Sequence, residues 1–92
     1  MALLSDEQIE TGLKGREWRR EGETLVREWR FADFGAAIAF VERVAEVAEA
    51  SNHHPDILVH GWNKVRLTLS THSEGGITAA DVALAQRLDG VG

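Results

Sequence analysis

The sequence contains no cysteine and only one proline among its 92 residues. Without cysteine, disulfide bonds, thiolate catalysis and cysteine-ligated zinc are all excluded. No apolar run approaches the roughly 18 residues that suggest a membrane-spanning helix, and the first residues lack the basic and apolar regions of a secretory signal. We therefore expect a cytoplasmic protein that does not bind membranes.

An excess of positive charge is also missing, because the formal net charge is −5. The arginines between residues 16 and 30 alternate with glutamates, which is typical of a solvated surface of mixed charge. Nucleic-acid binding is therefore not expected. The composition is 43% hydrophobic and 27% charged, as in ordinary globular proteins. We expect a single domain over residues 1–92, small enough to favour self-association.

Capping signals and periodicity predict the element order α-β-β-α-β-β-α. Ser5 and the acidic residues after it begin a short helix that ends between Gly12 and Gly15. Residues 18–31 form a hairpin with its turn at Glu21-Gly22. In the second half of this hairpin the apolar residues Leu25, Trp29 and Phe31 fall on the same face of the strand. Arg27 falls on that face too and is the one charged residue there.

The longest helix is expected to start at Asp33, as its N-cap, and to end before Pro55, because a proline disfavours the α conformation in the residue before it. Its small residues allow close helix–helix packing, so the helix could also serve a subunit interface. Apolar residues at helical spacing predict a buried stripe made of Phe34, Ile38, Val41, Val44, Ala45 and Ala48.

Two strands follow, over residues 57–59 and 62–70. In the second, Val65, Leu67 and Leu69 alternate with polar residues, which indicates a half-buried antiparallel strand. Thr78 caps a last helix that runs to Leu88. This order predicts an α+β fold, in which three helices pack on one face of a four-stranded antiparallel sheet.

All four histidines lie between residues 53 and 72. His53 and His54 follow the long helix, and Glu49 stands four residues before His53, where it could accept a ring N–H. His72 ends a strand within Ser70-Thr71-His72-Ser73, at the kind of strand end where sites gather. Asp81, in the first turn of the last helix, could orient His72.

Each of these signals also has an ordinary structural explanation. The His-His-Pro segment could simply terminate a helix, Glu49 could be a solvated charge, and Asp81 is favourable at any helix N-terminus. Trp62 suits the core or an interface. The histidine spacing does not suit one metal ion, so no metal site is expected, and Ser70 and Ser73 lack a nucleophile elbow. General acid–base catalysis by imidazoles, with a reference pKa of about 6.5, remains.

Taken together, these residues resemble the pterin-4a-carbinolamine dehydratase family. The resemblance covers nearly the whole chain, and the Trp18, Gly22 and Asp33-Phe34 positions also match the family. Its most specific part consists of Glu49, His53-His54-Pro55, Asn63-Lys64-Val65, the segment from Leu67 to His72, Gly76 and Asp81.

The resemblance implies a homodimer or homotetramer that dehydrates 4a-hydroxytetrahydropterins produced by aromatic amino-acid hydroxylases. No cofactor is implied, because the pterin is the substrate. The catalytic residues would be His53, His54 and His72, supported by Glu49 and Asp81. The residues that line the pterin pocket would be Asn52, His53, His54, Pro55, Ser70, Thr71, His72 and Ser73.

Two features depart from the common family pattern. One additional residue separates Pro55 from Trp62, which predicts a larger turn or a bulge near His60-Gly61. Asn52 stands where many relatives carry aspartate.

Two alternative functions stay open. One is a pterin-binding or dimerisation module without turnover, of the kind that partners a homeodomain transcription factor. The other is a pterin reaction linked to molybdopterin metabolism.

Overall fold

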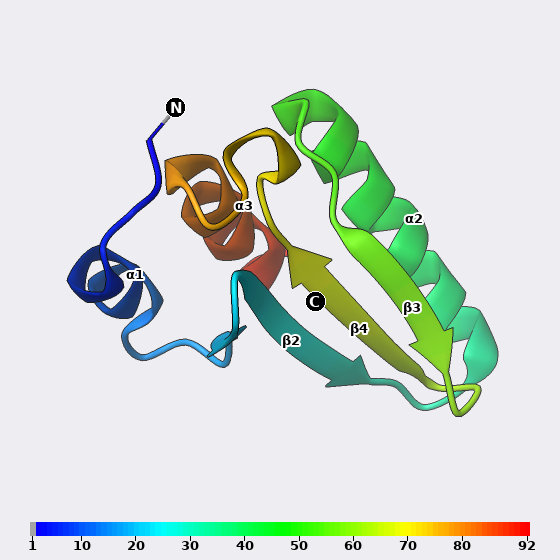
Figure 1. The fold of residues 1–92 in the computed structure, drawn as a ribbon. Coiled ribbons are helices and arrows are strands. Elements are labelled where there is room, and N and C mark those ends of the chain that lie inside the picture. The colour runs from blue at the N-terminus through cyan, green and yellow to red at the C-terminus, as the bar shows by residue number, and fades with distance from the viewer. Residues whose placement is uncertain (1) are drawn as a thin grey trace.

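The computed structural model describes residues 2–92 and places a four-stranded antiparallel sheet at its centre, with strand order β1-β2-β4-β3 (Figure 1). The three helices pack on one face of this sheet, so the predicted fold class and element order are confirmed. The elements are α1 Asp6–Leu13, β1 Arg19–Glu21, β2 Thr24–Arg30, α2 Phe34–Ser51, β3 Asp56–His60, β4 Lys64–Leu69, the 3₁₀ helix η1 His72–Glu74, and α3 Ala79–Asp89.

The helices begin at the residues that their capping signals predict. The Ser5 hydroxyl accepts from the backbone N–H of Gln8 at 3.1 Å, and the Gln8 side chain accepts from the Ser5 N–H, which completes a capping box. The Asp33 carboxylate caps α2 by accepting from the Ala36 N–H at 2.7 Å. Helix α2 ends at Ser51, before Pro55, as predicted.

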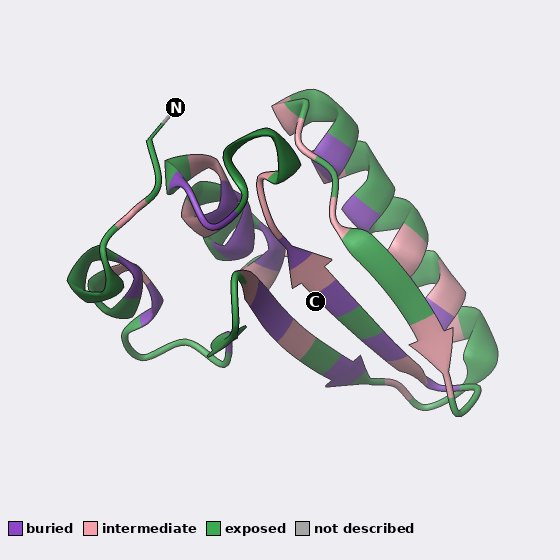
Figure 2. Ribbon diagram, viewed as in Figure 1, coloured by how far each residue is buried: buried purple, intermediate pink, exposed green. Residues whose placement is uncertain are grey.

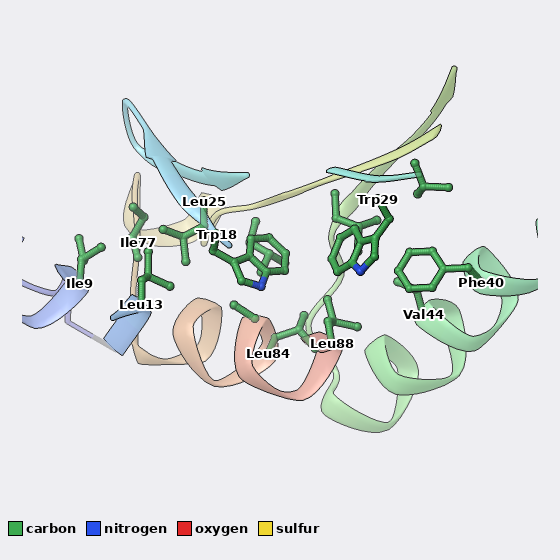
Figure 3. Packing of buried hydrophobic residues seen from close by; sticks show 14 of the residues in the cluster. Ile9, Leu13, Trp18, Leu25, Trp29, Phe40, Val44, Ile77, Leu84 and Leu88 are labelled. Carbon is green, nitrogen blue, oxygen red and sulfur yellow. The ribbon is translucent and has the colours of Figure 1, made fainter. Parts of the chain in front are cut away.

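The core lies between the sheet and the helices (Figure 3). Residues along β4 alternate in burial, as Figure 2 shows, because successive side chains of a strand point to opposite faces. In β2 the neighbours Leu25 and Val26 are both buried. The predicted inward parity of β4 is confirmed. The buried residues of the core come from both the sheet and the helices and include Leu25, Trp29, Val65, Leu67, Leu69, Phe40, Val44, Leu84 and Leu88.

The predicted buried stripe of α2 is wrong in part. The buried residues of this helix are Ala37, Phe40, Val44 and Ala48, whereas Phe34 is 55% exposed and Ala45 is also exposed. At about 100° per residue, Phe34 and Ala45 lie on the side of the helix turned away from Phe40. Alanines at many positions blurred the pattern from which the buried side was predicted.

The connection between β3 and β4 corrects the prediction for Trp62. This residue lies in the turn rather than in β4, and it is 62% exposed, so it is not part of the core. Gly61 and Trp62 both adopt the left-handed conformation, with φ of 54° and 58°. The pairing is regular up to His60 opposite Lys64, so the additional residue is accommodated in a turn rather than in a bulge.

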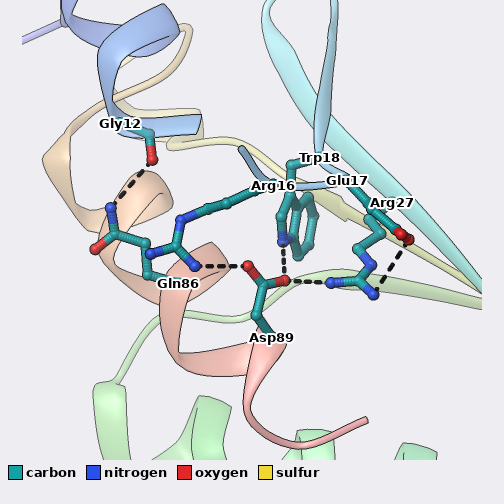
Figure 4. A network of polar contacts seen from close by, with 7 residues as sticks. All are labelled: Gly12, Arg16, Glu17, Trp18, Arg27, Gln86 and Asp89. Carbon is teal, nitrogen blue, oxygen red and sulfur yellow. Dashed lines mark hydrogen bonds and ion pairs between the residues drawn. The ribbon is translucent and has the colours of Figure 1, made fainter. Parts of the chain in front are cut away.

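The Arg27 exception is explained by an ionic cluster on the helix side of the sheet (Figure 4). The Arg27 guanidinium lies 4.3 Å from the centre of the Trp29 ring, and its Nη1 donates to Asp89 Oδ1 at 2.5 Å. Asp89 also accepts from Trp18 Nε1 at 2.7 Å and from Arg16 at 2.8 Å. The cluster therefore fastens the β1–β2 hairpin to the end of α3.

None of the helices formed by residues 2–92 is both long and apolar enough to cross a membrane.

Candidate active site

Three segments that carry the predicted site residues gather at one end of the sheet. They are the end of α2, the loop after β4 and the start of α3, all at the upper edge of Figure 1. Helix α2 ends here because Asn52 adopts the left-handed conformation, with φ of 50°, and its N–H bonds to the Glu49 carbonyl. The His53 N–H then bonds to the Ala48 carbonyl at 3.2 Å, which fixes the direction in which the chain leaves the helix.

His53 is held by a buried carboxylate. Its Nε2 lies 2.6 Å from Oδ1 of Asp81, whose side chain has no solvent exposure. Oδ2 of Asp81 accepts from the Thr78 N–H at 2.9 Å and from the Thr71 hydroxyl at 2.7 Å. The His53 side chain itself keeps 18% of its surface exposed. A fixed imidazole with one edge open to solvent can meet a ligand in a defined orientation.

His54 forms a second histidine–carboxylate pair, with Glu49. The ring Nε2 contacts Oε2 of this glutamate, and both side chains are largely exposed. An exposed pair of this kind orients the ring only weakly, because water competes for both charges. His54 is therefore the more accessible of the two adjacent imidazoles.

His72 opens η1, in a loop that returns on itself. Its carbonyl accepts from the Gly75 N–H at 3.2 Å, and Gly75 is left-handed with φ of 72°. The loop is closed at its base, where the Thr71 N–H donates to the Gly76 carbonyl at 2.8 Å. The His72 imidazole is exposed and makes no hydrogen bond to any other residue of the described chain. Both ring nitrogens are free for a ligand.

The structure exchanges the carboxylate partners that the sequence predicted. Glu49 contacts His54 rather than His53, and Asp81 contacts His53 rather than His72. The first prediction assumed that α2 continues to His53, whereas the left-handed Asn52 turns the chain and ends the four-residue spacing. The second was wrong because α3 packs against α2, so that Asp81 reaches the segment after α2.

The other predicted pocket residues differ in where their polar groups go. Asn52 and Ser73 are exposed, and Pro55 is half-buried. The Ser70 hydroxyl instead donates to the Glu23 carbonyl at 3.1 Å, and the Thr71 hydroxyl is directed to Asp81. Sequence reasoning assigned no site role to Thr78. Its place three residues before Asp81, the spacing of a capping box, was the signal that could have found it.

His60, the fourth histidine, lies apart from this site at the far end of β3. Its Nε2 contacts Oε1 of Glu28 at 2.5 Å on the sheet face opposite the helices. The hydrogen bond from His60 lowers the pKa of the Glu28 carboxyl below its ordinary value. This pair offers a natural control, since it repeats the His54–Glu49 chemistry away from the candidate site.

A surface hollow of about 760 Å³ lies elsewhere, between α1 and the Trp18–Arg20 segment. It contains none of the predicted site residues, and its rim mixes acidic and basic side chains. Within residues 2–92, no three His, Asp or Glu side chains are grouped so that they could hold a metal ion. The histidine cluster is therefore the better candidate for chemistry.

Comparison with known proteins gives a consistent result. The family model described as "Pterin 4 alpha carbinolamine dehydratase" matches residues 2–91. A Nocardia farcinica protein is 51% identical over 88 residues, covering 95% of this chain and 92% of the relative. A Metallosphaera sedula protein is 48% identical over 90 residues, covering 97% and 93%. Both relatives are provisionally named pterin-4-alpha-carbinolamine dehydratase.

Two solved structures share the fold. A Brucella melitensis protein described as a transcriptional coactivator/pterin dehydratase superposes with a TM-score of 0.88 at 30% identity, over 97% of both chains. A pterin dehydratase-like protein, described as a RuBisCO assembly factor in the alpha-carboxysome, gives a TM-score of 0.70 at 26% identity. That match covers 84% of this chain and 90% of the other.

Proposed function

The chain belongs to the pterin 4 alpha carbinolamine dehydratase family, and on that premise we propose that it removes water from a 4a-hydroxytetrahydropterin to give a quinonoid dihydropterin. The observation that carries this proposal is the placement of His53, His54 and the His72 loop at one end of the sheet. Three imidazoles with different degrees of restraint suit proton transfer at neutral pH.

The chemistry needs one acid and one base. The substrate carries its hydroxyl on a carbon next to a ring nitrogen, and hydroxide is a poor leaving group. An acid protonates the hydroxyl as the C–O bond breaks, and a base takes the proton from a ring nitrogen as the C=N bond forms. One molecule of water leaves, so the step needs neither an oxidant nor a reductant. We assign no cofactor to it.

We divide these tasks among the histidines according to how firmly each imidazole is held. We assign the two proton transfers to His54 and His72, whose imidazoles are exposed and can approach the substrate. His53, fixed by Asp81, is assigned to binding and polarising the ring. Exposed Asn52 and Ser73 could contribute further polar contacts. The product would return to an aromatic amino-acid hydroxylase after reduction, which makes the reaction part of pterin recycling.

A stopped-flow assay on chemically generated 4a-hydroxytetrahydropterin tests the proposal. His54→Ala and His72→Ala should each slow dehydration by about 10²-fold or more, the usual contribution of a positioned acid or base. His60→Ala is the matched control and should keep the wild-type rate, because His60 lies away from the site. Wild-type rates in both site variants would contradict the assignment.

A second candidate function is a binding module without turnover. It is favoured by the solved relative described as a RuBisCO assembly factor, a protein that shares the fold. The same assay separates the two functions, because a module of this kind would leave the uncatalysed dehydration rate unchanged. Measuring pterin binding by calorimetry beside the assay would show whether such a module still holds the ligand.

A further inference from the structure

Two threonine hydroxyls lie behind the His53–Asp81 pair and form a chain with it. The Thr71 Oγ1 is 2.7 Å from Asp81 Oδ2 and 2.8 Å from the Thr78 Oγ1. The Thr78 Oγ1 also accepts from the Ala80 N–H at 3.2 Å. Thr78 has no solvent exposure and Thr71 is half-buried, so water competes little for these bonds.

The direction of each bond in this chain follows from proton counting. A carboxylate only accepts, so Thr71 gives its single hydroxyl proton to Asp81. Thr78 must then donate its own proton to Thr71, which leaves the Thr78 oxygen to accept from Ala80. Every donor points toward Asp81, and the chain has one consistent direction.

The ionised Asp81 carboxylate determines which nitrogen of His53 carries a proton. Oδ2 of Asp81 receives two donors, from the Thr71 hydroxyl and the Thr78 N–H, and Oδ1 faces the imidazole. Since Oδ1 can only accept, Nε2 of His53 must donate. In the neutral ring the lone pair is therefore on Nδ1.

We propose that Thr71 and Thr78 are positioning residues, whose hydroxyls hold Asp81 so that His53 is kept as the Nε2–H tautomer with Nδ1 free. Sequence resemblance assigned Thr71 to substrate contact, whereas its hydroxyl is directed inward to Asp81. The effect on turnover rests on the proposed function. The tautomer is a property of the folded chain alone.

Thr71 also connects two parts of the site. Its backbone closes the loop that carries His72 by pairing with Gly76, and its carbonyl accepts from the Glu74 N–H at 3.0 Å. Its side chain meanwhile reaches the carboxylate that holds His53. Thr71 thus connects the His72 loop to the His53–Asp81 pair. This connection would hold the His53 and His72 imidazoles in fixed positions relative to each other.

Nitrogen-15 NMR of the imidazole rings, recorded where they are neutral, tests the tautomer directly. We expect the wild-type His53 to show a protonated Nε2 and an unprotonated Nδ1. Thr71→Val removes the hydroxyl at nearly constant shape. It should let the Asp81 carboxylate turn away from Nε2, so that His53 moves toward a mixture of tautomers. Thr71→Ser keeps the hydroxyl and should restore the wild-type spectrum. Thr68→Val is the matched control, because Thr68 lies on β4 shortly before Thr71 but on the sheet face away from the helices.

Kinetics on the same variants test the role in turnover. Thr71→Val should lower kcat/KM by about 10-fold to 100-fold, a cost typical of losing a partner that orients a histidine, because His53 is assigned to binding and polarising the ring. Thr71→Ala makes the same comparison if valine disturbs the fold. An unchanged His53 spectrum or an unchanged kcat/KM in Thr71→Val would overturn the proposal. If the wild type showed no dehydration at all, the proposed function would fail, while the NMR comparison would still decide the positioning role.

Discussion

His53 and Asp81 lie 28 residues apart in the sequence, yet their side chains meet at 2.6 Å with the carboxylate fully buried. The contact joins the end of α2 to the first turn of α3. A carboxylate in such a place needs donors on every side, because an unpaired buried charge is costly. The Thr71 hydroxyl and the Thr78 N–H supply the donors that His53 does not.

Replacing Asp81 by asparagine should lower both stability and turnover. The amide keeps one acceptor oxygen and brings an NH₂ group toward donors, so at least one buried polar group is left unsatisfied. We expect a loss of about 1–3 kcal/mol in the free energy of unfolding. Urea denaturation measures this loss, and stopped-flow dehydration measures the rate. Equal stability of Asp81→Asn and wild type would contradict the network.

The Asp89 cluster should contribute stability without contributing to turnover. Asp89→Ala removes the acceptor shared by Trp18 Nε1, Arg16 and Arg27, and leaves the largely buried Arg27 guanidinium with only the exposed Glu17 carboxylate at 3.4 Å. We expect a cost of about 2 kcal/mol or more in urea denaturation.

Asp6→Ala is the matched control for this cluster, because Asp6 also pairs with an arginine, Arg20, but is 91% exposed. Its effect should stay within about 0.5 kcal/mol. The dehydration rate per folded molecule should not change in either variant, since both aspartates lie away from the histidines. Similar stabilities for the two variants would refute the special role of Asp89.

The Glu28–His60 pair predicts a pH dependence of stability. Because the pKa of Glu28 is lowered in the folded chain, its ionised form stabilises the fold above the unfolded value of about 4.3. That contribution is lost as the pH falls through the lowered pKa. The stability difference between wild type and Glu28→Gln should therefore be fully present at about pH 5–6 and shrink in stronger acid.

Carbon-13 NMR titration of the Glu28 carboxyl measures this lowering directly. In His60→Ala the pKa should move back toward its ordinary value, since the hydrogen bond from His60 is the largest cause of the shift. A Glu28 pKa that does not respond to His60→Ala would show that another group is responsible.

The dehydration rate should not depend on a bound metal ion. The proposed reaction uses imidazoles as both acid and base, and no step needs a Lewis acid. We expect the same rate before and after exhaustive dialysis against a chelator, with the residual metal content checked by mass spectrometry. A rate that falls on dialysis and returns with one divalent ion would require a different mechanism.

Local chemistry explains why much of the fold could be predicted. The caps at Ser5, Asp33 and Thr78 and the stop before Pro55 depend on neighbouring residues alone, and all four were confirmed. The alternation that predicted the buried side of β4 is likewise local. These signals need no knowledge of what packs against the element.

The carboxylate partners could not be predicted, because they depend on tertiary packing. Glu49 was expected to reach His53, but the left-handed Asn52 turns the chain there and His54 takes the contact. Asp81 was expected to serve His72, but the approach of α3 to α2 brings it to His53. The members of the candidate site stay a prediction from the sequence, and the structure pairs its histidines and carboxylates differently.

The most direct test of the central claim is the rate at which the wild-type protein dehydrates 4a-hydroxytetrahydropterin at neutral pH, compared with His54→Ala under the same conditions. We predict a large acceleration over buffer by the wild type that falls by about 10²-fold or more in the variant. A folded wild type that leaves the buffer rate unchanged would contradict the assignment of this site to dehydration.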